Sequence, residues 1–96
     1  MTTIRWAPQA ADDLEAIRDF IARDSPHYAQ LVCQRILASI EQLALFPLMG
    51  RVIPELAMPD VRDLIVAPYR IVYRVRGDTV EIATIFHAAR LLPLKM

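Results

Sequence analysis

The residues of this chain with the clearest capacity for chemistry lie between positions 68 and 90, in the stretch "PYRIVYRVRGDTVEIATIFHAAR". One strand-like segment carries Arg70, Arg74 and Arg76, and the next runs into His87 and then Arg90. Guanidinium groups bind carboxylates and phosphates through forked pairs of hydrogen bonds, and histidine exchanges a proton near neutral pH. The stretch therefore predicts an anion-binding surface, which is a polar outer face, a catalytic site or a surface for a partner.

A β-hairpin must position these residues. Gly77 and Asp78 separate two Val/Ile/Tyr-rich segments, and glycine in the first position suits a two-residue type II′ turn. Around such a turn, opposed residues have numbers that sum to about 155, by the register that a two-residue loop imposes. The apolar pairs, which we expect to pack against helices, are Val75 with Val80, Tyr73 with Ile82, Ile71 with Thr84 and Tyr69 with Phe86.

The opposite face of the same hairpin is predicted to carry the charges. Its pairs are Arg74 with Glu81, Val72 with Ala83 and Arg70 with Ile85, and His87 follows at the end of the sheet. Arg74 and Glu81 are therefore expected to form a cross-strand ion pair. Arg70 has no such partner on the hairpin, and we expect it to reach the same anion as His87.

The elements before the hairpin predict an α+β fold. Residues 2–6 form an opening strand, and a first helix begins at Pro8, with Asp13, Glu15, Arg18 and Asp19 turned outward. Ser25 and Pro26 cap and start a second helix that ends at Phe46-Pro47. Residues 46–60 read as an irregular connection, and strands follow at 61–66, 69–76 and 79–87. The prediction is a helical hairpin packed on a small antiparallel β-sheet, in the order β-α-α-β-β-β.

Length and composition narrow the functional classes. The 96 residues fit one domain, 1–96, and the formal net charge is zero, although residues 1–60 carry five Lys/Arg against eight Asp/Glu and residues 61–96 carry six against three. Neutrality disfavours strong sequence-independent nucleic-acid binding. The single cysteine, Cys33, gives no disulfide framework and is expected to be buried packing. Neither His27 nor His87 has a cluster of metal-ligating residues around it, so no metal or cofactor is expected, and the chain is expected in the cytoplasm without a membrane segment.

Three segments carry a resemblance to a known family. They are "FPLMGRVIPEL" (46–56), "VRDLIVAPYRIVYRV" (61–75) and "VEIATIFHAAR" (80–90). In this order and spacing, the sequence resembles the ParE/RelE superfamily of toxins from bacterial type II toxin–antitoxin pairs, and the likeness covers essentially the whole chain. It implies a cognate antitoxin as partner, whose acidic, amphipathic C-terminal segment folds onto the toxin.

The superfamily contains two activities, and the resemblance leaves both open. RelE-like members are ribosome-dependent mRNA endoribonucleases, and Glu55, Arg70 and His87 match their carboxylate, arginine and histidine. These would supply a base toward a 2′-hydroxyl and a group that stabilises the phosphorane charge. The chain departs from that pattern at Ala88, where such nucleases carry an aromatic residue. The "FHAAR" ending and the neutral charge are similar to the ParE branch, whose members inhibit DNA gyrase without a nuclease site.

We therefore predict a ParE-like toxin that inhibits DNA gyrase, with a RelE-like endoribonuclease as the alternative and a pure interaction module as a third reading. Each candidate residue also has a structural interpretation: a strand-end cap for His87, a carboxylate clamp for Arg70, a loop tether to Arg51 for Glu55. The residues predicted to bind a partner are Arg62, Arg70, Arg74, Arg76, His87 and Arg90.

Overall fold

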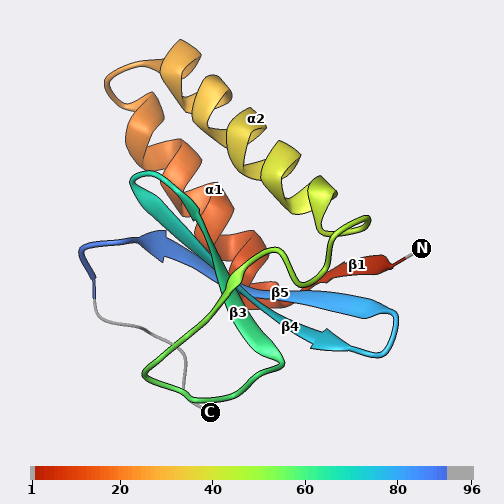
Figure 1. Cartoon of the computed structure of the whole chain (residues 1–96). Coiled ribbons are helices and arrows are strands. Elements are labelled where there is room, and N and C mark those ends of the chain that lie inside the picture. The colour runs from red at the N-terminus through yellow and green to blue at the C-terminus, as the bar shows by residue number, and fades with distance from the viewer. Residues whose placement is uncertain (1, 91–96) are drawn as a thin grey trace.

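The computed structural model describes residues 2–90, and these form two helices on one face of a five-stranded sheet (Figure 1). The predicted α+β architecture is thus confirmed. The elements are β1 (Thr3–Trp6), α1 (Pro8–Ala22), α2 (Pro26–Gln42), β2 (Arg51–Val52), β3 (Val61–Val66), β4 (Tyr69–Arg76) and β5 (Thr79–His87).

The helical hairpin forms where the capping residues predict it. Pro8 and Pro26 occupy first-turn positions, and the Ser25 Oγ accepts a hydrogen bond from the Tyr28 N–H at 3.1 Å. The second helix ends at Gln42, earlier than the predicted Phe46-Pro47. The amides of residues 43, 44 and 45 bond three residues back instead of four, so the chain tightens into turns before Pro47 is reached.

The sheet has the order β1-β5-β4-β3-β2 and differs from the predicted one in two ways. First, β1 runs parallel to β5, whereas a purely antiparallel sheet was expected. A parallel pair requires a long connection, and here it contains both helices and the strands β2, β3 and β4. Second, the segment predicted to be irregular contains the two-residue strand β2, which pairs antiparallel with β3 through Arg51–Asp63 and Val52–Arg62.

The hairpin of β4 and β5 has the predicted turn but not the predicted register throughout. Gly77 has a φ of +57°, as the first turn position requires, and the pairs from Arg76–Thr79 to Tyr73–Ile82 follow the expected sums. The register then shifts between Val72 and Tyr73, where a β-bulge adds one residue to β5 that has no partner on β4. Beyond it, the predicted pairs are wrong, and the observed pairs are Val72 with Thr84, Ile71 with Ile85, Arg70 with Phe86 and Tyr69 with His87.

Asp13 of α1 stabilises this bulge. Its Oδ2 accepts hydrogen bonds from the Thr84 hydroxyl at 2.5 Å and from the Ile85 N–H at 3.0 Å. The expectation that Asp13 turns outward is therefore wrong: a carboxylate bonded to β5 holds the irregular strand against the helix. Only the tertiary structure brings these groups together, because they are more than 70 positions apart in the chain.

Each face of the sheet carries a buried apolar cluster. On the helix side, Ile71, Tyr73, Val80, Ile82 and Ile85 pack against Val32, Ile36 and Ile40 of α2. On the other side, a second cluster of Ile53, Val61, Val72 and Phe86 is completed by Leu56 and Met58 from the loop before β3. Since the bulge exchanges the faces beyond it, Ile85 joins the helix-side core and Phe86 the second cluster, the reverse of the predicted position of Phe86. Within residues 2–90, neither helix is long and apolar enough to cross a membrane.

Candidate functional site

Arg70 lies on the face of the sheet remote from the helices, in an ion pair with a buried carboxylate. Its Nε donates to Asp63 Oδ2 at 2.8 Å, and its Nη2 lies 2.7 Å from the same oxygen. The Asp63 side chain is fully buried, and that of Arg70 is 12% exposed. The Arg70 guanidinium also lies 5.2 Å from the centroid of the Phe86 ring. Arg70 therefore already binds a carboxylate of its own chain at the position where it was expected to bind an external anion.

Arg51 is the second partner of Asp63. Its Nε donates to Asp63 Oδ1 at 2.8 Å and its Nη2 to Oδ2 at 3.4 Å, and its side chain is 57% exposed. The hydrogen bond that Arg51 donates to Asp63, together with the negative charge of Asp63, raises the pKa of Arg51, with a smaller contribution from Glu55. The carboxylate and two guanidiniums form a cluster, Arg51–Asp63–Arg70, that ties β2, β3 and β4 together.

Asp63 is the residue that the sequence interpretation missed. A signal was present, since "VRDLIV" alternates Val61, Asp63 and Ile65 on one face, and a carboxylate within an apolar strand face needs a cationic partner. The sequence did not show which cations pair with Asp63, because Arg51 and Arg70 belong to β2 and β4, whereas Asp63 belongs to β3. Glu55 is exposed in the loop, and Arg51 binds Asp63 rather than being tethered by Glu55 through a hydrogen bond.

His87 lies on the other face of the sheet, beside α1. It pairs in register with Tyr69, which packs against the helix-side core, and the two rings meet edge to face at 5.8 Å. Its Nδ1 accepts the Ala89 N–H at 3.1 Å, the strand-end cap that was one interpretation of this residue. His87, Arg90 and Tyr69 line a cavity of about 760 Å³ whose α1 side includes Phe20 and Arg23.

The structure therefore does not bring Arg70 and His87 to one anion. Residues 70 and 86 turn to the Asp63 side of the sheet, and residues 69 and 87 turn to the helix side. The bulge is the cause, since without it His87 would share the face of Arg70. The three residues that match the nuclease pattern thus lie in separate environments, with Glu55 in the exposed loop.

The remaining predicted partner-binding residues are distributed over several places. Arg62 turns to the helix side, where its Nη1 donates to the carbonyls of Leu48 at 3.2 Å and Gly50 at 2.9 Å, so it holds the loop before β2. Arg74 pairs in register with Glu81 as predicted, but the expected ion pair with Glu81 is wrong: the carboxylate beside the Arg74 Nε is that of Asp60, with Oδ2 at 3.7 Å. Arg76 and Arg90 are exposed at the two ends of the β4–β5 hairpin.

Tyr73 fixes the loop that leads to Arg51. Its ring is fully buried, its hydroxyl donates to the Pro47 carbonyl at 2.9 Å, and the same oxygen accepts the Gly50 N–H at 2.9 Å. Burial raises the pKa of this phenol above its usual 10.0. A Cβ on Gly50 would lie 2.6 Å from both Asp63 O and Tyr73 Oη, so only glycine fits there. This contact sets the position at which Arg51 reaches Asp63.

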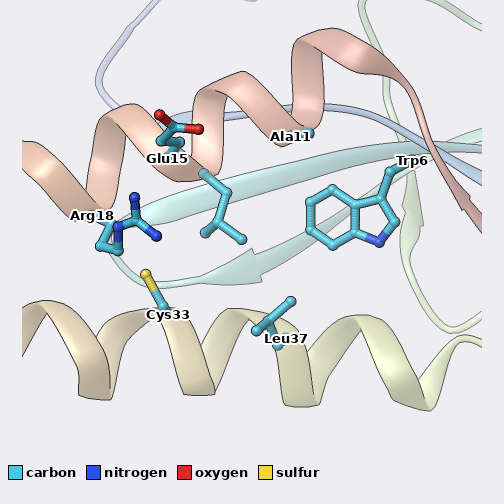
Figure 2. Close-up of a pocket in the computed structure, with 7 residues that line it drawn as sticks. Trp6, Ala11, Glu15, Arg18, Cys33 and Leu37 are labelled. Carbon is cyan, nitrogen blue, oxygen red and sulfur yellow. The ribbon is translucent and has the colours of Figure 1, made fainter.

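A second cavity, of about 380 Å³, lies between the helices (Figure 2). Trp6, Leu14 and Leu37 give it apolar walls, and Cys33 of α2 faces Arg18 of α1 across it. Burial raises the pKa of the Cys33 thiol, and Arg18 opposes this weakly, which favours the protonated, less nucleophilic form. Among residues 2–90, no group of three or more His, Cys, Asp or Glu side chains is arranged to hold a metal ion.

Comparison with known proteins identifies the family. Residues 4–92 match the model for the ParE toxin of the type II toxin–antitoxin system, parDE. Toxin RelE2 of Caulobacter vibrioides is 41% identical over 92 residues, which cover 95% of this chain and all of that protein. The putative toxin Y4kP of Sinorhizobium fredii is 38% identical over 92 residues, 94% of this chain and 92% of that one.

Solved structures agree with this. A chain from the chromosomal ParDE TA system of P. aeruginosa superimposes with a TM-score of 0.75 at 29% identity, over 91% of this chain and 96% of that one. The YoeB/ParE toxin from Agrobacterium tumefaciens shares the fold, with a TM-score of 0.63 at 21% identity, over 90% and 98%. Fold, sequence and family model together show that this chain belongs to the ParE toxin family of type II toxin–antitoxin systems.

Proposed function

We propose that this toxin acts as an inhibitor of DNA gyrase and that a cognate antitoxin with an acidic C-terminal segment neutralises it. The observation that carries the proposal is the separation of Arg70 and His87 onto opposite faces of the sheet. A nuclease that used both would need them within reach of one phosphodiester. The match to the ParE family over residues 4–92 supports the same conclusion.

The electrostatics support it as well. An arginine that stabilises a phosphorane must have hydrogen-bond donors available to the transferring phosphate. The Nε of Arg70 donates to Asp63 Oδ2, and its Nη2 lies 2.7 Å from the same oxygen. Releasing them would leave Asp63 buried with only Arg51 as a partner, which is energetically unfavourable. Arg70 is therefore better suited to holding the sheet than to binding RNA.

The alternative function is a RelE-like, ribosome-dependent mRNA endoribonuclease. The name of the Caulobacter relative, Toxin RelE2, favours it, as does the presence of Glu55, Arg70 and His87 in this chain. In that case His87 is the residue available for acid–base chemistry. Its Nε2 takes part in no hydrogen bond within residues 2–90, and its ring borders the larger cavity.

Purified toxin separates the two functions. We expect it to stabilise gyrase–DNA cleavage complexes, or to block supercoiling, while translated mRNA stays intact. His87→Ala is the matched variant, because His87 is exposed and its loss should leave the fold unchanged. Retained growth inhibition in this variant agrees with gyrase as the target. Cleaved transcripts that disappear with His87→Ala, without any effect on gyrase, would overturn the proposal.

A further inference from the structure

We infer that the cavity between α1 and the end of β5 binds a nucleoside phosphate, either as a free nucleotide or as the terminal nucleotide of a DNA strand. The inference goes beyond the proposed inhibition of gyrase, which requires no nucleotide bound to the toxin. It follows from the size of the cavity, the aromatic rings that line it and the balance of its charges.

The cavity has the size of a small-molecule site. Its volume of about 760 Å³ falls in the range of about 300–1,000 Å³ that is typical of ligand pockets. Ile85, which lines it, belongs to the helix-side core, and Ile17 of α1 packs against that core, so the cavity has an apolar base. Of the three residues that match the nuclease pattern, only His87 lines this cavity.

Three aromatic rings line the cavity, and one of them is largely uncovered. Phe20 on α1 is 66% exposed, although its ring is large and apolar. Tyr69 and His87 meet edge to face at 5.8 Å on the strand side. Nucleobases stack on exposed aromatic side chains, because every base has a flat π-face. Phe20 therefore offers a surface that a base can cover.

The two acids that line the cavity already have partners within the chain. Asp13 accepts hydrogen bonds from the Thr84 hydroxyl and the Ile85 N–H. The Asp19 carboxylate lies 3.5 Å from the Arg18 guanidinium. These contacts offset the negative charge that the two carboxylates would otherwise present to an anionic ligand.

The cations of the cavity, in contrast, are available. Arg23 and Arg90 line it, and neither side chain forms an ion pair with another part of residues 2–90. The Arg23 guanidinium lies 6.0 Å from the centroid of the Phe20 ring, so a cation stands beside the uncovered ring. His87 adds a hydrogen-bond donor: its Nδ1 accepts the Ala89 N–H, so the neutral ring carries its proton on Nε2.

This combination of groups is complementary to a nucleoside phosphate. Guanidinium groups bind phosphate through forked pairs of hydrogen bonds, and an aromatic ring stacks on a base. An inorganic anion would leave the rings uncovered, and an uncharged apolar ligand would leave the guanidiniums without a counter-charge. A second copy of this chain, placed with the same cavity opposite, would bring like charges together. A nucleotide uses both the rings and the cations.

A titration of the full-length toxin with adenosine 5′-monophosphate, followed through its amide chemical shifts, tests the inference. We expect the shifts to fall on residues 17–23 and 85–90. Binding should be at least about tenfold tighter than that of adenosine or of inorganic phosphate, because each fragment makes only part of the contacts. Thymidine 5′-monophosphate and a 5′-phosphorylated pentathymidylate distinguish the two sources. Equal affinity indicates a free nucleotide, and tighter binding of the oligonucleotide indicates a DNA strand end.

Two matched pairs of variants locate the binding. Phe20 and Phe46 are 66% and 63% exposed, and only Phe20 lines the cavity, so Phe46→Ala is the control for Phe20→Ala. Arg35→Gln, at an exposed position of α2 that does not line the cavity, is the control for Arg23→Gln. Phe20→Ala and Arg23→Gln should each weaken binding of adenosine 5′-monophosphate about tenfold, through lost stacking and a lost charged hydrogen bond. The controls should change it less than about twofold.

Three results would overturn the inference. If inorganic phosphate binds as tightly as adenosine 5′-monophosphate, the cavity is a simple anion site. If the same amides shift with rising toxin concentration and without nucleotide, the surface serves self-association. If Phe46→Ala weakens binding as much as Phe20→Ala, the nucleotide binds elsewhere. Thermal unfolding of each variant shows whether its fold is intact. Gyrase is absent from these measurements, so a negative result leaves the proposed function standing.

Discussion

Arg70 and His87 occupy adjacent positions along the β4–β5 ladder yet face opposite sides of the sheet. Arg70 pairs with Phe86 and Tyr69 pairs with His87, so successive pairs alternate between the Asp63 side and the helix side. Their chemical types match a nuclease, and their placement does not bring them to one substrate. Several stability measurements can test the contacts that produce this placement.

Replacing Arg70 should destabilise the fold rather than remove a reactive group. In Arg70→Ala, Asp63 keeps Arg51 but loses its more buried partner, and breaking a buried pair from one side costs about 3 kcal/mol. Urea denaturation measures this free energy. Arg76→Ala, an exposed position at the end of β4, is the control and should change stability by less than about 0.5 kcal/mol. Equal effects of the two substitutions would contradict the structural role of Arg70.

Removing the carboxylate of Asp13 should loosen the bulge that separates Arg70 from His87. Asp13→Ala leaves the Ile85 N–H and the Thr84 hydroxyl without this charged acceptor, at a cost of about 1.5–3 kcal/mol. Native-state hydrogen exchange at the Ile85 amide should accelerate more than at the Val75 amide, which bonds to Asp60. The neighbouring, exposed Asp12→Ala is the control. Unchanged exchange at Ile85 would show that the bulge does not depend on Asp13.

Gly50 and Gly77 should respond to alanine for different reasons. At Gly50, a Cβ would meet Asp63 O and Tyr73 Oη at 2.6 Å, and overpacking of this kind costs about 1–3 kcal/mol. At Gly77, nothing lies within 4 Å of the added Cβ, and the cost arises from the φ of +57°, about 1–2 kcal/mol. Asparagine tolerates that conformation, so Gly77→Asn should recover much of the loss in thermal unfolding, whereas Gly50→Asn should not. Similar recovery at both positions would refute the distinction.

The buried phenol of Tyr73 should make stability fall at alkaline pH. Burial raises its pKa in the folded state above the usual 10.0, so above about pH 10 the unfolded chain loses the proton first. The stabilisation is complete below that pH and is lost as pH rises through the folded-state pKa. Tyr73→Phe should lower stability at neutral pH by about 1–3 kcal/mol, because Gly50 N–H and Pro47 C=O lose their partner.

The same substitution should also flatten the alkaline decline in stability. Tyr69, whose pKa is raised by burial as well, leaves a residual slope in the variant. Denaturation series from pH 8 to 11 compare the two proteins. If stability falls with pH as steeply in Tyr73→Phe as in the wild type, a group other than Tyr73 causes the alkaline loss of stability.

The sequence by itself determined the fold class and most of the elements, although not β2 or the end of α2. Ser25 and the two prolines mark the helix starts, Gly77-Asp78 marks the hairpin, and the apolar spacing predicts a helical pair on a sheet, because caps, turns and periodicity act over a few residues. The resemblance to the toxin superfamily, carried by three segments, agrees with the family match.

The tertiary structure alone decided what the charged residues do. A bulge of one residue in β5, held by a carboxylate from α1, reverses the face of the β5 side chains beyond it and takes His87 away from Arg70. Asp63 becomes the centre of the charged cluster only because β2 and β4 flank β3 and bring Arg51 and Arg70 to it. Local sequence does not encode these relationships, since each depends on contacts between strands and helices that are far apart in the chain.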